Sequence, residues 1–238
     1  ALTAPILEAA GVDMLLVGDS LGNVILGHSS TLPVTLEDME RATAAVARST
    51  SRAMIVADLP FGTYEDTVEH AFASASRLMK AGAHAVKLEG GRSRAHIIAG
   101  LVSAGIPVCA HLGYTPQSEN TLGGPRMQGR GAGADALRRD AEAVETAGAF
   151  AVVFEMVPAS IATELTQSLN IPTIGIGAGP HTDGQVLVWS DMAGYSEWTP
   201  SFVRTFGQLG QALREAASDY VEAVRERSFP GPDNYKND

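Results

Sequence analysis

Apolar and polar positions along the chain repeat one pattern, in which a helical run ends at Ala-Gly or a near equivalent and a short apolar strand follows. EAAGVDMLLVGDS, MKAGAHAVKLEGG, VSAGIPVCAHLG and ETAGAFAVVFEMVP all share it. In each, one glycine stands where a helix C-cap favours left-handed backbone; these are Gly11, Gly82, Gly105 and Gly148. The strands that follow are nearly continuous in Val, Ile, Leu and Ala, which is typical of parallel strands covered on both faces.

This pattern predicts about seven strands, and a short apolar start near Leu2 is a candidate for an eighth. The predicted ranges are 14–18, 54–58, 84–89, 107–111, 150–155, 172–176 and 186–190. Amphipathic helices are expected between them, at 35–48, where Thr35 and Asp38 form a capping arrangement, at 65–80 and at 201–227.

Strands and helices alternate along the chain without a linker, which indicates one α/β domain. Eight such units in about 240 residues predict a single (β/α)₈ TIM barrel over residues 1–229. A doubly wound open sheet is the structural alternative. The tail at 230–238, PGPDNYKND, offers nothing apolar to bury and is predicted to be mobile.

Composition narrows the classes of partner. The chain has 238 residues, with 17 Lys and Arg against 27 Asp and Glu, a net charge of −10 that disfavours nucleic acid or an anionic membrane as main partner. No apolar run approaches the ~18–20 residues of a membrane span, so we expect a cytoplasmic protein. The single cysteine, Cys109, rules out a disulfide within the chain and a cysteine-based zinc site.

Ionisable residues gather where the predicted strands end. Barrel enzymes place their chemistry at the carboxyl ends of their strands, and six ends here carry such a residue: Asp19, Asp58, Glu89, His111, Glu155 and Asp191. A lone acid after a strand is more often a helix cap or turn former, and this is how we interpret Asp191. Four carboxylates at one barrel mouth, however, repel strongly unless a cation or a proton relieves them.

A hard cation suits this set better than protons do. Asp19, Asp58 and Glu89 offer only oxygen ligands, which favours Mg²⁺ and makes zinc the weaker prediction. Lys87 shares a strand face with Glu89, so both are expected inside the barrel, as an internal ion pair or as parts of one site. The long loop HLGYTPQSENTLGGPRMQGRG is interpreted as a functional cover or a disordered segment.

With these residues identified, the chain resembles the ketopantoate hydroxymethyltransferase family. The resemblance is carried by LLVGDSLGNVILGH, TLPVT, VADLPFGTYE, AHAVKLEGG, GIPVCAHLGYTPQS, LGGPRMQGR, FEMVPA and IPTIGIGAGPHTDGQVLVWSDMAG, which cover most of the chain in the family order. It implies a (β/α)₈ enzyme of pantothenate biosynthesis that binds a 2-oxo acid through magnesium. The family usually has an aromatic and acidic segment after LTA, whereas Ala4 here runs directly into Pro5.

The resemblance also implies roles for individual residues. Asp19 and Asp58 are implied as metal ligands, with Glu89 completing the metal shell, and Glu155 as the general base. The 2-oxo acid is implied to contact Asp19, Ser20, Asp58, Lys87 and His111.

The implied reaction moves a hydroxymethyl group from 5,10-methylenetetrahydrofolate to 3-methyl-2-oxobutanoate through an enolate, in a homo-oligomer, a decamer by resemblance. A magnesium-dependent lyase or aldolase acting on another 2-oxo acid, and a non-catalytic metabolite-binding barrel, are the alternatives.

Overall fold

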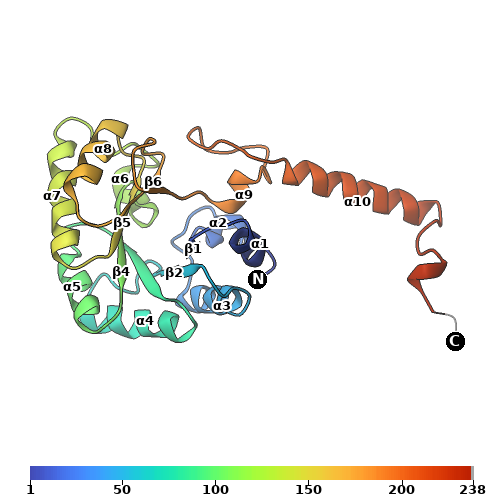
Figure 1. Ribbon diagram of the computed structural model, residues 1–238, viewed down its shortest axis with the longest axis horizontal. Coiled ribbons are helices and arrows are strands. Elements are labelled where there is room, and N and C mark those ends of the chain that lie inside the picture. The colour runs from blue at the N-terminus through green and yellow to red at the C-terminus, as the bar shows by residue number, and fades with distance from the viewer. Residues whose placement is uncertain (237–238) are drawn as a thin grey trace. The chain divides into compact units, whose positions relative to one another are not determined.

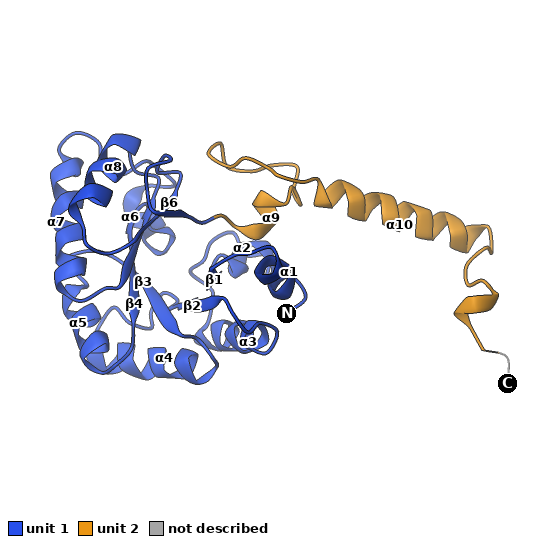
Figure 2. Cartoon of the chain, in the orientation of Figure 1, with its two compact units in different colours: residues 1–186 blue, residues 187–238 orange. Residues whose placement is uncertain are grey.

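The computed structural model describes residues 1–236, and its internal contacts divide the chain into two compact units, Ala1–Val186 and Leu187–Asp238 (Figure 2). All of the predicted strand-end residues except Asp191 lie in the first unit. The extent of the barrel to residue 229 and the mobility of the tail remain predictions. Residues 237–238 of that tail lie outside the described residues, and Pro232–Asn234 forms a 3₁₀ turn, η2.

One parallel sheet organises the first unit, and its strands lie side by side in the order of the sequence (Figure 1). The strands are β1 (Met14–Val17), β2 (Met54–Asp58), β3 (Ala85–Glu89), β4 (Val108–Gly113), β5 (Ala151–Glu155), β6 (Thr173–Ile176) and β7 (Gly184–Gln185). Sequential parallel order with helical crossovers is the arrangement of a TIM-type barrel. The predicted fold class is therefore confirmed, with seven strands paired among the described residues.

Two predicted strands are wrong. The segment 186–190 is not a strand, because the seventh strand is Gly184–Gln185 and helix α9 (Trp189–Met192) begins within the predicted range. A short apolar run does not distinguish strand from helix by its periodicity. The start near Leu2 is also not a strand: helix α1 (Ala4–Ala9) begins there, with Pro5 in its first turn, where a missing N–H costs no helical bond.

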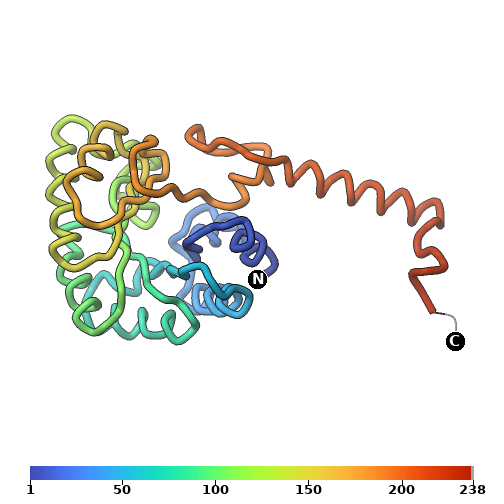
Figure 3. Tube along the Cα trace, in the orientation of Figure 1, coloured from blue at the N-terminus to red at the C-terminus, as the bar shows by residue number. Residues whose placement is uncertain are grey.

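Helices of the first unit connect the successive strands from β1 to β6, as the tube trace shows (Figure 3), whereas residues 177–183 between β6 and β7 form no helix. They are α2 (Leu21–Val24), α3 (Leu36–Ala47), α4 (Val68–Lys80), α5 (Ala95–Ser103), α6 (Glu119–Leu122), α7 (Gly133–Thr146) and α8 (Ala159–Ser168), with a 3₁₀ turn η1 (Pro116–Ser118). The four predicted C-cap glycines all adopt positive φ. The predicted capping box is also present, since Thr35 and Asp38 bond each other's backbone N–H.

Alternation along the strands separates two apolar clusters. Val86 and Leu88 of β3 belong to the large core that also contains side chains of α3, α4, α5, α7 and α8. On the opposite face, Ala85 of β3 and Cys109 of β4 belong to a smaller cluster formed by the strands. A strand residue two positions further on shares the same face, so the side chains of Lys87 and Glu89 extend the inner cluster toward the carboxyl ends.

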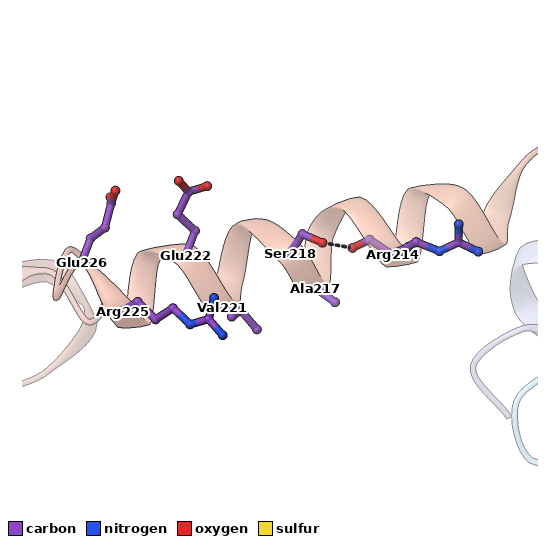
Figure 4. Close-up of a pocket in the computed structure, with 7 residues that line it drawn as sticks. All are labelled: Arg214, Ala217, Ser218, Val221, Glu222, Arg225 and Glu226. Carbon is purple, nitrogen blue, oxygen red and sulfur yellow. Dashed lines mark hydrogen bonds between the residues drawn. The ribbon is translucent and has the colours of Figure 1, made fainter.

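The second unit contains α9 and a longer helix, α10 (Leu209–Arg225). The helix predicted at 201–227 therefore exists from residue 209, while residues 203–208 have no regular structure. Figure 4 shows a shallow pocket on α10, lined by Arg214, Ala217, Ser218, Val221, Glu222, Arg225 and Glu226. Within residues 1–236, every helix is too short or too polar to span a membrane.

Thr35→Ala is expected to lower the free energy of unfolding by about 1 kcal/mol, because it removes the side-chain acceptor for the Asp38 N–H at the start of α3. Denaturant unfolding monitored by circular dichroism measures this change. Thr163→Ala within α8 is the matched control, since Thr163 bonds only the carbonyl oxygen of Ala159 in its own helix. Equal stabilities of Thr35→Ala and the control would contradict the capping role.

Candidate active site

Strand register brings the predicted residues together at one end of the sheet. Asp58 of β2 stands opposite Lys87 of β3, and Glu89 of β3 stands opposite His111 of β4. Glu155 ends β5, opposite Gly113. Partners in adjacent parallel strands project to the same face, so these side chains converge. Strand ends and the family resemblance predicted these residues, and the structure places their side chains in one cluster.

A continuous chain of contacts between ionisable side chains links four of the strands, β2 to β5. Lys87 Nζ lies 3.2 Å from Asp58 Oδ1 and 3.3 Å from His111 Nδ1. His111 Nδ1 lies 3.5 Å from Glu89 Oε1, and its Nε2 lies 3.2 Å from Glu155 Oε2. Lys87 therefore forms an ion pair with Asp58 on the neighbouring strand. The alternative prediction, an ion pair between Lys87 and Glu89, is not found among the described residues.

Asp19 and Ser20 reach the cluster from the turn after β1. The backbone N–H of Asp19 donates to Asp58 Oδ2 at 3.0 Å, which ties this turn to the end of β2. A Cβ on Gly18 would lie 3.0 Å from Ser20 Oγ and 3.5 Å from Asp58 Oδ2, so the absence of a side chain there lets the two groups approach. Both predicted residues of this turn thus border the charged cluster.

Backbone geometry fixes the position of Glu155. Gly113 has φ +97°, and a Cβ at this position would lie 2.2 Å from the carbonyl oxygen of Glu155. On the other side, Met156 adopts φ 47°, a left-handed conformation that is unusual for a residue with a side chain and that clusters at functional sites. The Glu155 side chain is 16% exposed, against 3–4% for Asp58 and Glu89, so it is the most open of these three carboxylates.

Two further residues of the site were missed by the strand-end analysis. Gln117 in η1 and Tyr64 in the loop after β2 are both buried, and both bond residues of the cluster. Neither is a charged residue at a strand end. Gln117 does lie in the block GIPVCAHLGYTPQS, so its loop had been marked, but nothing in the sequence pointed to this side chain.

The buried charges shift one another's pKa values. Burial, together with the Asp58 carboxylate, raises the pKa of Asp19 to about 7. Burial opposes protonation of His111, but the carboxylates of Glu155 and Glu89 outweigh it and raise the pKa of His111 to about 9. The same balance holds for Lys87, whose pKa is raised by Asp58, Glu89 and Asp19 despite its burial. The carboxylates therefore favour the cationic forms of both Lys87 and His111, against the repulsion between these two neighbouring groups.

The donor set fits a hard divalent cation that shares its coordination with other ligands. Four carboxylates, those of Asp19, Asp58, Glu89 and Glu155, face two cations, which leaves an excess of two negative charges when all are ionised. Asp58 Oδ1 and Glu89 Oε1 are buried, and the ion pairs with Lys87 and His111 are the contacts that these oxygens make. No three His, Cys, Asp or Glu side chains in residues 1–236 form a ready-made metal cage. Mg²⁺ needs only one or two carboxylates, since water and substrate oxygens fill its remaining positions.

Among the other sequence candidates, Asp191 does not end a strand and lies in the first turn of α9. Asp191 is also not the cap of this helix, because the N-cap of α9 is Val188. The pocket on α10 is formed by one helix and contains none of the predicted site residues (Figure 4). The cluster in the first unit is therefore the candidate active site.

Fold and site together define a barrel enzyme with a buried acid–lysine–histidine cluster suited to proton transfer at the carboxyl ends of its strands. A family profile described as ketopantoate hydroxymethyltransferase matches residues 1–232. The chain belongs to the ketopantoate hydroxymethyltransferase family and is a hydroxymethyltransferase of pantothenate biosynthesis.

Close relatives agree with this assignment. The chain is 56% identical over 233 residues to the 3-methyl-2-oxobutanoate hydroxymethyltransferase of Corynebacterium efficiens, covering 97% of this chain and 87% of the relative. It is 54% identical over 235 residues to the enzyme of the same name from Leifsonia xyli subsp. xyli, covering 98% and 85%. The predicted family, and the class of reaction that it implied, are confirmed.

Solved structures confirm the fold class. A crystal structure of phosphonopyruvate hydrolase complexed with oxalate and Mg²⁺ is similar with a TM-score of 0.61 at 14% identity, covering 98% of this chain and 84% of that one. 2,3-Dimethylmalate lyase, a member of the PEP mutase/isocitrate lyase superfamily, is similar with a TM-score of 0.59 at 17% identity, covering 99% and 83%. At these identities the likeness concerns the fold alone.

In protein freed of metal by a chelator, His111 is expected to contribute more to stability near neutral pH than in alkaline solution. Its pKa in the folded protein, about 9, is above the ordinary value of 6.5, so the stabilisation is fully present below 6.5 and is lost as the pH rises through 9. The difference in free energy of unfolding between the native chain and His111→Asn should fall by roughly 2–3 kcal/mol across this range.

Urea unfolding on both sides of this pH range measures that difference. The same substitution at exposed His96, on the surface of α5, is the matched control. A His111 difference that stays constant with pH would show that the imidazole is not held as a cation by Glu89 and Glu155.

Proposed function

We propose that the chain transfers a hydroxymethyl group from 5,10-methylenetetrahydrofolate to 3-methyl-2-oxobutanoate, giving 2-dehydropantoate. The single observation that carries this proposal is the contact chain from Asp58 through Lys87 and His111 to Glu155. This chain of contacts connects buried carboxylate oxygens to Glu155, which is the most exposed of the carboxylates that it links. Such an arrangement provides a place to hold a 2-oxo acid beside a base that can take its proton.

Asp19 and Asp58 would hold Mg²⁺ through carboxylate oxygens, and Glu89 would complete the metal shell. The excess of carboxylates over cations in the cluster supports this assignment; the buried oxygens Asp58 Oδ1 and Glu89 Oε1 face Lys87 Nζ at 3.2 Å and His111 Nδ1 at 3.5 Å. When bound, Mg²⁺ would polarise the keto group of the substrate and make the adjacent C3–H more acidic.

The cations of the cluster suit the charged end of the substrate. Lys87 is buried and cationic, and it would face the carboxylate of the 2-oxo acid once the ion occupies the neighbouring oxygens of Asp58. Ser20, at the start of α2, would donate its hydroxyl to the same carboxylate. His111 lies between Lys87 and Glu155 and would donate a hydrogen bond to the substrate oxygen.

Glu155 would act as the general base. Its carboxylate is held at 3.2 Å by the His111 imidazolium and reaches the open side of the cluster, where the C3 proton of the substrate would lie. The electron pair left on C3 forms the new bond to the methylene carbon of the folate. Water supplies the hydroxyl group to this carbon as its two bonds to the folate nitrogens break. These nitrogens take up the proton held by Glu155 and the remaining proton of the water, and tetrahydrofolate leaves. Family resemblance also supports a cytoplasmic homo-oligomer, a decamer.

Glu155→Gln is expected to lower the rate of exchange of the substrate C3 proton with solvent by at least about 100-fold, because the amide does not accept this proton. Proton NMR of 3-methyl-2-oxobutanoate in D₂O with Mg²⁺ measures the exchange without the folate. Binding of Mg²⁺ should survive in the variant. Exchange at the native rate would exclude Glu155 as the base.

Glu142→Gln on the exposed surface of α7 is the matched control and should exchange the proton at the native rate. Adding 5,10-methylenetetrahydrofolate to the native chain should then give 2-dehydropantoate. Cleavage of the oxo acid without the folate would instead indicate a lyase or aldolase, and binding without exchange would indicate a non-catalytic barrel.

A further inference from the structure

Gln117 is an uncharged residue buried within the acidic cluster. It lies in η1, directly after β4, and its side chain is buried at 6% exposure. Its amide nitrogen Nε2 donates to Asp19 Oδ2 at 2.8 Å and to the carbonyl oxygen of Leu59 at 3.0 Å. Its backbone N–H donates to Glu89 Oε2 at 3.0 Å. One residue therefore binds two of the three carboxylates assigned to the metal.

The orientation of the Gln117 amide follows from its partners. Both Asp19 Oδ2 and the Leu59 carbonyl are acceptors, so the group that faces them is the NH₂ and the remaining atom is the carbonyl oxygen. That oxygen, Oε1, accepts a hydrogen bond from the Tyr64 hydroxyl at 2.6 Å. Each hydrogen-bonding position of the amide is thus used within a buried network.

Tyr64 connects the network back to β3. Its hydroxyl oxygen accepts from the backbone N–H of Glu89 at 3.2 Å while its proton is directed to Gln117. The ring is 2% exposed, and burial raises the pKa of the phenol, so the hydroxyl keeps its proton and stays a donor. Tyr64 and Gln117 together hold Glu89 through its backbone and through one carboxylate oxygen.

The hydrogen bonds divide the carboxylate oxygens into two sets. Asp19 Oδ2 and Glu89 Oε2 are each held by Gln117, and Asp58 Oδ2 is held by the Asp19 N–H. The second oxygen of Asp58 lies 3.2 Å from Lys87 Nζ, and that of Glu89 lies 3.5 Å from His111 Nδ1. A carboxylate fixed through one oxygen has the other aimed in one direction, which favours binding of a small ion through a single oxygen of each group.

We propose that Gln117, oriented by Tyr64, is a positioning residue that sets the affinity of the site for Mg²⁺. This inference rests on the assignment of Asp19, Asp58 and Glu89 as metal ligands in the proposed function. A neutral donor serves here because a cation would compete with the metal and an acid would add to the repulsion. Groups that orient metal ligands typically contribute 10–100-fold to metal affinity.

The test measures metal binding directly, with Mn²⁺ as the probe, by the loss of the electron paramagnetic resonance signal of the free ion, and with Mg²⁺ by calorimetry. Gln117→Met keeps the length of the side chain and removes its donors, and should weaken binding by about 10–100-fold. Tyr64→Phe removes one hydroxyl and should weaken binding by a few-fold. The double variant should lose less affinity than the two single losses multiplied together, because part of the effect of Tyr64 is exerted through Gln117.

Gln167→Met on the exposed side of α8 is the matched control and should bind the ion as the native chain does. Saturating Mg²⁺ should restore kcat in Gln117→Met, whereas general damage to the site would leave kcat low at any concentration of the ion. Denaturant unfolding in the presence of a chelator checks that each variant is folded.

Asp58→Asn distinguishes an error in the proposed metal site from an error in the positioning role of Gln117. If it leaves Mn²⁺ binding unchanged, the proposed metal site is wrong and the role of Gln117 falls with it. If Asp58→Asn abolishes binding while Gln117→Met and Tyr64→Phe bind as tightly as the native chain, the metal site stands and the positioning role is overturned. A loss of kcat in Gln117→Met that excess Mg²⁺ does not restore would likewise overturn it.

Discussion

An unequal balance of buried charge governs this site: four carboxylates share the inner face of one sheet end with only two cations. Lys87 and His111 neutralise part of the charge, and Asp19 responds with a pKa raised to about 7. Removing one partner of a buried ion pair typically costs about 3–5 kcal/mol, so these groups depend on one another. The remaining negative charge is what makes a divalent cation a natural occupant and neutral hydrogen-bond donors the natural supports.

The sheet creates this balance through its register. Adjacent parallel strands lie about 4.8 Å apart, whereas residues two positions apart along one strand are separated by about 6.6 Å. For this reason Lys87 pairs with Asp58 on the neighbouring strand rather than with Glu89 on its own. The apolar side chains at the preceding inward positions, such as Ala85 and Cys109, form the inner apolar cluster next to the charged groups.

Sequence reasoning identified the charged part of the site because charge at the end of an apolar strand is visible in one dimension. Asp19, Asp58, Lys87, Glu89, His111 and Glu155 all come together as the strand ends predicted. Gln117 and Tyr64 could not be found in this way, since uncharged loop residues acquire their role only from partners distant in sequence. The short apolar runs near Leu2 and at 186–190 misled for the opposite reason, because without periodicity an apolar run does not specify a strand.

The close approach of Gly113 to the backbone of Glu155 has a consequence for how the protein tolerates variation. A Cβ at residue 113 would meet the Glu155 carbonyl oxygen at 2.2 Å, and the positive φ disfavours any side chain there. A substitution at this uncharged position would therefore displace the carboxylate on the neighbouring strand without touching its chemistry. A substitution at residue 113 is therefore expected to reduce activity much as the loss of Glu155 would, even though Glu155 itself is unchanged.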